Sequence, residues 1–166
     1  MGYVNKTRKA SPVTRGFQAT RLRGETMKFR QAAIGDARHL ARFSIMMDGG
    51  FSDALYDGLV PGQSIESIYE PKYSQSGTTD FFQNHWIAEQ DGQVAGGIHS
   101  FPFDDFADDP PPDPRIPKER FAIFQPFSDL PADGAYFVNA LSVYPELCRR
   151  GIASSPVRCA TSVEPQ

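Results

Sequence analysis

The sequence predicts one mixed α/β domain, and three observations support this prediction. A short alternating segment leads into an amphipathic helical pattern, two hydrophobic runs flank an Asp-Gly pair, and a long apolar run precedes a glycine-bearing turn. The length of 166 residues suits a single domain. The chain is 40% hydrophobic and 22% charged. It has no apolar run of about 20 residues, which excludes an integral membrane protein.

The first 26 residues differ from the rest in charge. They hold six Lys and Arg residues and one Glu, a net charge of +5, so the total of −3 leaves −8 for the other 140 residues. They contain no apolar core of a secretory signal. We expect these residues to be a disordered basic tail. Met27 opens a strand-like segment and is a natural translation start, so the start at Met1 would be assigned too early. An organellar transit peptide and a nucleic-acid-binding arm are the alternatives.

The first regular elements are a strand and a helix. Residues 28–33 alternate as a strand does, and apolar residues then recur at helical spacing over 40–47. Asp36 is the expected N-cap of this helix, and the glycine pair 49–50 is its expected end. A second helical piece is predicted over 52–59.

A third helical piece is expected to begin after Ser64 as its cap, and a β-hairpin follows it. The hydrophobic runs 85–89 and 94–101 flank the Asp-Gly pair 91–92, which is the strongest hairpin signal in the chain. The glycine pair 96–97 inside the second strand predicts a bulge or the close approach of another backbone.

The segment 102–133 has the composition of a long insertion. Its part 103–114 is rich in Asp and Pro, so it predicts an exposed loop without helix or central strand. A calcium site is conceivable because hard cations bind carboxylates, but the spacing of a calcium loop is missing. A solvated loop is the preferred interpretation, and a lip that attracts a cationic substrate is the alternative. The apolar residues over 121–130 are expected to pack the insertion against the body.

The last third contains the most informative pattern. The run 135–144 is almost continuously apolar, which predicts a central strand that is buried on both faces. It leads into the turn 145–154, which carries Arg149, Arg150 and Gly151. A strand, a glycine-bearing turn and a following helix together favour phosphate binding through backbone N–H groups and arginine side chains. A plain connection between strand and helix is the alternative.

The stretch from Asn139 to Glu146, continued by Arg149 to Ser154, resembles the acetyl-coenzyme A motif of the GCN5-related N-acetyltransferase (GNAT) superfamily. The segment 29–41 and the hairpin also resemble elements of that family, and the match extends over about residues 27–160 in the same order. The resemblance implies an N-acetyltransferase domain over 27–166 with a GNAT-like mixed, mostly antiparallel sheet and flanking helices. The family's last strands and helix would be missing.

The resemblance also implies a function and a cosubstrate. The enzyme would transfer acetyl from acetyl-CoA to a primary amine of a small molecule or protein. The strand would bulge near residues 141–143 and pair with the pantetheine arm, the turn would wrap the pyrophosphate, and Gly151 would stand where a Cβ obstructs the phosphate. The implied cofactor-binding residues are Leu141, Ser142, Val143, Arg149, Arg150, Gly151, Ile152, Ala153 and Ser154.

No general base stands out from the sequence. Glu89 and Asn139 are the candidate catalytic residues, His99 and Tyr136 are further candidates, and a water relay would also suffice. Two cysteines and three histidines show no metal-ligand spacing, so no metal is expected.

Two departures from the family motif leave an alternative open. Cys148 stands where the motif usually has Arg or Gln, and the chain stops at Gln166 before the family's fifth strand. The alternative is a truncated, inactive remnant or a binding module that a partner completes, for instance a homodimer through the exposed sheet edge. No nucleic acid or membrane partner is expected, and the expected location is the cytoplasm.

Overall fold

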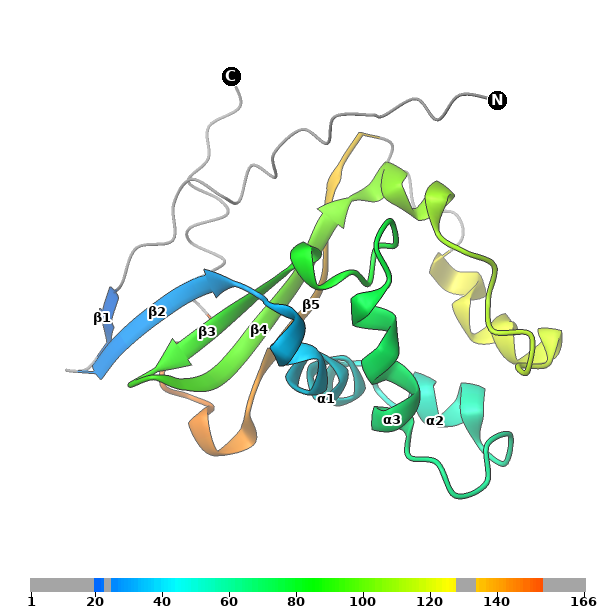
Figure 1. Ribbon diagram of the computed structural model, residues 1–166, viewed down its shortest axis with the longest axis horizontal. Coiled ribbons are helices and arrows are strands. Elements are labelled where there is room, and N and C mark those ends of the chain that lie inside the picture. Colours follow the sequence, from blue (N-terminus) through cyan, green and yellow to red (C-terminus); the bar gives the residue numbers. More distant parts are fainter. Residues whose placement is uncertain (1–19, 23–24, 128–133, 154–166) are drawn as a thin grey trace.

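The computed structural model describes residues 20–22, 25–127 and 134–153, which form one antiparallel sheet with helices. The sheet has five strands in the order β1-β2-β3-β4-β5, and α1 lies across one of its faces (Figure 1). The strands are β1 Thr20–Leu22, β2 Glu25–Gln31, β3 His85–Gln90, β4 Gln93–Pro102 and β5 Tyr136–Val143. The α-helices are α1 Ala37–Met47, α2 Phe51–Tyr56 and α3 Ile65–Tyr69. The 3₁₀ turns are η2 Ile34–Asp36, η3 Glu70–Ser74, η4 Phe82–Asn84, η5 Phe103–Asp108, η6 Lys118–Phe127 and η7 Pro145–Leu147.

The ordered sheet begins earlier than the sequence predicted. β1 and the first residues of β2 fall inside the segment 1–26, which was expected to be disordered. They are ordered because Thr20 pairs with Met27 and Leu22 with Glu25 in an antiparallel ladder. The prediction is therefore corrected at this end of the segment, and residues 1–19 lie outside the described residues.

The strand and the helix predicted from 28 to 47 are confirmed as β2 and α1. Asp36 does not cap α1 through its side chain. Its carboxylate accepts a hydrogen bond from the backbone N–H of Ala33 at 2.7 Å and two from the guanidinium of Arg30 at 2.7 and 2.9 Å. Asp36 stands at the predicted N-cap position of α1, but its side chain does not cap the helix, because the partly buried Arg30 on β2 binds the carboxylate at the corner between strand and helix.

Each face of the sheet has its own apolar cluster. On the α1 face, Leu40 is 1% exposed and Phe43 is 4% exposed, and both pack with Ile87 of β3. On the other face, Met27 packs with Ile152 from the turn after β5. Burial of each such side chain stabilises the fold by about 1.5–3 kcal/mol, so the two clusters hold the sheet between α1 and the turn.

The predicted hairpin is confirmed, with a different bulge. Asp91 and Gly92 have φ values of 50° and 80°, the left-handed pair that a two-residue turn needs. The register shifts between Ala88 and Glu89, whereas the glycine pair 96–97 serves close approach. A Cβ on Gly96 would lie 2.5 Å from the carbonyl oxygen of Ser142, which explains the glycine.

The other predicted helices are also confirmed. α2 overlaps the expected stretch 52–59 and begins one residue earlier, and Ser64 caps α3 because its Oγ accepts a hydrogen bond from the backbone N–H of Ser67 at 3.2 Å. No helix among the described residues has the length and apolar character needed to cross a bilayer.

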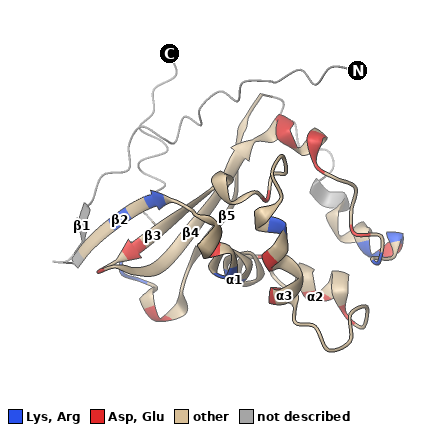
Figure 2. Ribbon diagram, in the orientation of Figure 1, with Lys and Arg blue, Asp and Glu red and all other residues tan. Residues whose placement is uncertain are grey.

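The insertion is less irregular than predicted. It contains the 3₁₀ turns η5 and η6. Proline disrupts the interior of an α-helix, but short 3₁₀ turns can still form between the prolines. Figure 2 shows its acidic residues along η5 and the segment after it. Ile116, Phe121 and Ile123 pack against Leu55 and its neighbours, as expected for a segment that returns to the body. Residues 128–133 lie outside the described residues.

Candidate functional site

The predicted cofactor strand is β5, which is the last strand of the sheet in the described part of the chain. The prediction of a central strand was wrong, and Val138 is 48% exposed. The apolar run suggested a central strand because the C-terminal half of β5 is covered on both faces. Its outer edge, however, pairs with no further strand among the described residues. The site is therefore built along a sheet edge.

The backbone of β5 directs two predicted residues outward. The backbone N–H of Tyr144 donates to the carbonyl of Ala95 on β4 at 2.9 Å. Because backbone groups alternate along a strand, the N–H and C=O groups of Leu141 and Val143 point away from β4. They form a short ladder edge that a ligand with amide groups can join.

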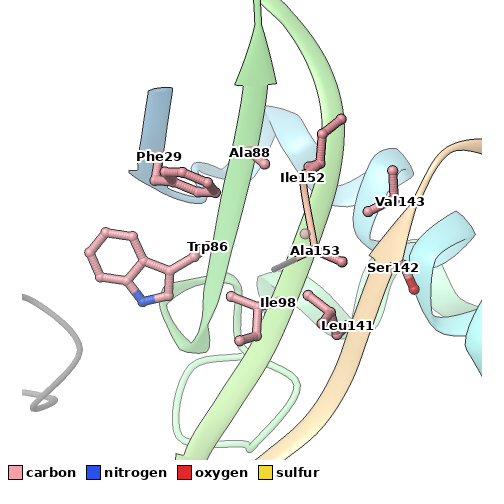
Figure 3. A pocket seen from close by; sticks show the side chains of 10 residues that line it. Phe29, Trp86, Ala88, Ile98, Leu141, Ser142, Val143, Ile152 and Ala153 are labelled. Carbon is pink, nitrogen blue, oxygen red and sulfur yellow. The ribbon is translucent and has the colours of Figure 1, made fainter. Parts of the chain in front are cut away.

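The side chains of these two residues line a small apolar hollow on the face opposite α1. Figure 3 shows Leu141 and Val143 turned toward Ile98 and toward Ile152 from the following turn. The lining residues are Phe29, Trp86, Ala88, Gly97, Ile98, Leu141, Ser142, Val143, Ile152 and Ala153. The structure thus brings Leu141, Val143, Ile152 and Ala153 together at one hollow, and their role in cofactor binding stays a prediction.

Ser142 contributes differently from its two neighbours. Its side chain is buried, and its Oγ donates a hydrogen bond to the backbone carbonyl of Phe43 in α1 at 2.8 Å. This bond ties β5 to the helix beneath it. Ser142 therefore fixes the strand, and its hydroxyl is turned away from the outer edge.

The turn after β5, which the sequence offers as a phosphate loop, contains left-handed backbone. Arg149 and Gly151 have φ values of 63° and 85°, and both are exposed. A Cβ on Gly151 would meet no atom within 4 Å, so the left-handed φ is what favours glycine here. Arg150 donates to the carbonyl of Glu146 at 3.3 Å, and Ser154 lies outside the described residues.

The thiol of Cys148 lies beside the outer edge of β5. It is exposed, and its Sγ is 3.7 Å from the carbonyl oxygen of Val143. It also lies 3.6 Å from the carbonyl oxygen of Tyr144, so the thiol is turned back toward the end of the strand.

The bulge of β5 lies at Asn139. Ala140 is opposite His99 and Val138 is opposite Ser100, so Asn139 is the extra residue of the strand. The expected bulge near 141–143 is corrected to Asn139, two residues before Leu141. Past a bulge a strand bends and twists more strongly. The bulge here separates the edge that carries Leu141 from the aromatic end of β5.

The predicted catalytic residue Asn139 contacts a buried histidine. Its Nδ2 lies 3.0 Å from Nδ1 of His99, whose Nε2 lies 2.9 Å from the carbonyl oxygen of Thr79. The ring of His99 stacks on that of His85 with the centroids 4.0 Å apart and the planes 9° apart. Burial lowers the pKa of both imidazoles, and the charge of His99 lowers the pKa of His85 further.

Glu89, the other predicted catalytic residue, belongs to a different cluster. Its carboxylate pairs with the guanidinium of Arg30 at 2.6 Å. Glu89 is opposite Val94 while the bulge is beside His99, so the two predicted catalytic residues lie on different strands and about 17 Å apart along the sheet. The structure does not bring Glu89 and Asn139 together.

Sequence reasoning did not single out His85 and Thr79. A usable signal exists for His85, because it and His99 stand at nearly equal distances from the Asp-Gly turn and are therefore opposite each other in the hairpin. Thr79 has no such signal, since it reaches His99 from an irregular segment.

Comparison with solved structures identifies the arrangement of these elements. The crystal structure of an N-acetyltransferase from Staphylococcus aureus Mu50 matches with a TM-score of 0.53 over 82% of this chain and 75% of that chain, at 20% sequence identity. This is an acetyltransferase fold. A second acetyltransferase crystal structure matches with a TM-score of 0.56 over 81% of this chain and 72% of that chain, at 16% identity. No family model and no curated protein matches the sequence.

The acetyltransferase fold confirms the predicted fold class, a mostly antiparallel GNAT-like sheet with flanking helices. At these identities the likeness extends to the fold alone. In the acetyltransferase fold of this chain, the bulge, the outer edge of β5 and the left-handed turn follow one another along the 15 residues from Asn139 to Ala153.

Proposed function

We propose that the protein is an N-acetyltransferase that transfers acetyl from acetyl-CoA to a primary amine of a small molecule or protein. One observation carries the proposal: the outward backbone groups of Leu141 and Val143 lie between a bulge at Asn139 and a left-handed turn at 149–151. A pantetheine arm has amide groups that suit such an edge, and a pyrophosphate suits such a turn.

The turn offers both charge and backbone donors to a diphosphate. Arg149 and Arg150 are exposed beside Gly151, so their guanidinium groups can form charge-assisted bonds with phosphate oxygens. Arg149 and Gly151 have left-handed φ values on either side of Arg150, and a turn of this kind can direct backbone N–H groups toward one side as a concave anion site. Ile152, only 3% exposed, anchors the turn on the sheet. The residues present therefore fit the cosubstrate.

Acetyl-CoA supplies an activated thioester, and during transfer the new C–N bond forms while the C–S bond breaks. An outward N–H of β5 near Leu141 would donate to the thioester oxygen as negative charge develops there. The edge would also hold the thioester in line with the amine. The proton lost by the amine would pass to a base or to water, and the coenzyme leaves as the thiolate. We also propose that the protein acts in the cytoplasm.

The experiment is a calorimetric titration of the purified chain with acetyl-CoA, beside two matched variants. Gly151→Glu places bulk and negative charge in the proposed phosphate turn. Gly62→Glu is its control, because Gly62 is also exposed, has a φ of 78° and has no atom within 4 Å of a Cβ. We expect binding by the wild type and by Gly62→Glu, and a loss of at least about tenfold in affinity for Gly151→Glu. Equal binding by both variants would contradict the assignment of the turn.

A second function is favoured by the position of β5 at the edge of the described sheet. Such an edge can pair with another chain, so the alternative is a module that binds without catalysis and is completed by a second copy. Sedimentation with and without acetyl-CoA separates the two. A monomer that acetyl-CoA stabilises supports the enzyme, whereas a folded dimer that does not bind acetyl-CoA supports the module.

A further inference from the structure

The buried histidine of β4 belongs to a hydrogen-bonded chain with a defined direction. Nε2 of His99 lies 2.9 Å from the carbonyl oxygen of Thr79, and a carbonyl oxygen only accepts, so Nε2 carries the proton. A neutral imidazole then has only an acceptor at Nδ1, which receives a hydrogen bond from Nδ2 of Asn139 at 3.0 Å. The orientation of the Asn139 carboxamide is thereby determined.

The surroundings of His99 hold its ring in place. The ring of His85 is stacked against it, and Phe101 packs with its centroid 4.8 Å away. His85 is in turn held by the edge of the Tyr73 ring and by the carbonyl of Phe81, 3.3 Å from its Nδ1. Its buried Nε2 has no hydrogen-bond partner among the described residues. The pair is a rigid stack of two neutral rings.

The charged groups around the stack act in opposite directions. Burial lowers the pKa of both histidines, and the charge of His99 lowers the pKa of His85 further. Asp80 and Asp109 are the acidic groups that raise the pKa of His99, and Asp109 is engaged with the backbone N–H of Thr79 at 2.6 Å. Burial raises the pKa of Tyr73 well above its usual value, so its hydroxyl stays neutral beside them.

Asn139 stands where the proposed reaction takes place. A diphosphate at the turn 149–151 and a pantetheine arm along Val143 and Leu141 bring the thioester to the next position along β5, which is the bulge. Asn139 is exposed, and with its Nδ2 held by His99 its Oδ1 is directed away from the histidine. The bulge therefore presents a hydrogen-bond acceptor beside the acetyl group.

We propose that His99 is a positioning residue for acetyl transfer, which holds the Asn139 carboxamide so that Oδ1 accepts a hydrogen bond from the incoming amine. This inference rests on the proposed function. An amine that donates one N–H to Oδ1 keeps its lone pair free for the acetyl carbon. Protonation of His99 would make Nδ1 a donor, and the carboxamide would then have to reverse and present N–H groups to the amine. Transfer therefore requires the neutral ring.

The first test does not depend on activity. Nitrogen NMR of the full chain labelled in histidine reports the tautomer of His99, and we expect the proton on Nε2. Asn139→Asp replaces the donor by a carboxylate and is expected to raise the pH at which His99 titrates by about one unit or more. Val138→Asp is the matched control, because it adds the same charge at the exposed neighbouring position. A proton on Nδ1, or equal shifts in both variants, would overturn the proposal.

The second test separates the two nitrogen positions of His99. The amide of His99→Asn stands near the position of Nδ1 and keeps an acceptor for Asn139, whereas that of His99→Gln stands near Nε2 and keeps only the donor to Thr79. Both lose the stacked ring. With tyramine, lysine and spermidine as probe amines, we expect kcat/KM to fall about tenfold further in His99→Gln than in His99→Asn, with equal affinities for acetyl-CoA.

The outcomes distinguish this inference from the proposed function. If the wild type binds no acetyl-CoA, the proposed function fails and the positioning role fails with it. If the wild type binds acetyl-CoA and transfers acetyl, but the two His99 variants have the same kcat/KM, only the positioning role is overturned.

Discussion

Two polar clusters of the sheet differ in what they hold. The corner cluster, made of Arg30, Asp36 and Glu89, joins one cation to two carboxylates at distances of 2.6 to 2.9 Å. The histidine cluster, made of His85, His99, Thr79 and Asn139, contains no charge and leaves Nε2 of His85 without a partner among the described residues. The ion pairs of the corner cluster hold one corner of the fold in place. The neutral hydrogen bonds of the histidine cluster set which groups donate and which accept, and protonation of His99 would reverse that order.

The largest change in stability is expected when the cation of the corner cluster is removed. Arg30→Met leaves the buried carboxylate of Asp36 beside Glu89 without its partner. Because Arg30 is 28% exposed, we expect a loss of about 2–3 kcal/mol in the free energy of unfolding, below the full cost for a buried pair. Urea unfolding measures it. Arg38→Met is the control, since its pair with Glu66 is exposed and its loss should leave the unfolding midpoint nearly unchanged.

The two clusters should lose their stabilising effects in different pH ranges. The pKa of His85 and of His99 is lowered in the fold by burial, so the unfolded chain binds more protons below about pH 6.5 and stability falls there as the pH falls. The slope approaches about 1.4 kcal/mol per pH unit for each histidine. Burial opposes ionisation of Asp36, but hydrogen bonds from Arg30 and Ala33 lower its pKa, so its contribution is lost only below about pH 4.

Unfolding measured from pH 7 to pH 3 checks this order. In His85→Phe the decline between about pH 6.5 and 5 should become shallower, while the decline below about pH 4 stays. Arg30→Met should change the acid range alone. An unchanged profile in His85→Phe would show that this histidine does not stay neutral in the fold.

A smaller effect is expected at the seam between β4 and β5, on which the histidine cluster lies. Gly96→Ala would place a Cβ 2.5 Å from the carbonyl oxygen of Ser142, and a backbone atom cannot move aside as a side chain does. We expect a loss of about 1–3 kcal/mol in stability, together with weaker acetyl-CoA binding, because β5 is displaced. Gly35→Ala, where a Cβ meets nothing within 4 Å, should leave both quantities nearly unchanged.

The smallest effect is expected at the bond between β5 and α1. Ser142→Ala removes the hydrogen bond to the carbonyl of Phe43 and should cost about 1 kcal/mol of stability. Acetyl-CoA affinity should not change, because the hydroxyl lies on the face away from the outer edge. A marked loss of affinity without a loss of stability would place the hydroxyl in the binding site instead.

The sequence predicted the elements that local patterns control. Alternation and helical spacing located β2 and α1, the Asp-Gly pair located the hairpin, and Ser64 was recognised as a cap. In each case the decisive residues are neighbours in the chain, so the physical cause is visible in a short window. The turn with Arg149, Arg150 and Gly151 was also singled out from a short window, and its role in phosphate binding stays a prediction.

Only the tertiary structure decided which polar groups meet. The amino-acid order by itself determined the strands, the helices, the hairpin and a glycine-bearing turn, since these depend on propensities and spacing over a few residues. It did not determine that Arg30 captures both Asp36 and Glu89, that the bulge falls at Asn139, or that His99 holds that residue. Those contacts depend on the register of strands far apart in sequence, and a shift of one residue in register would exchange their partners.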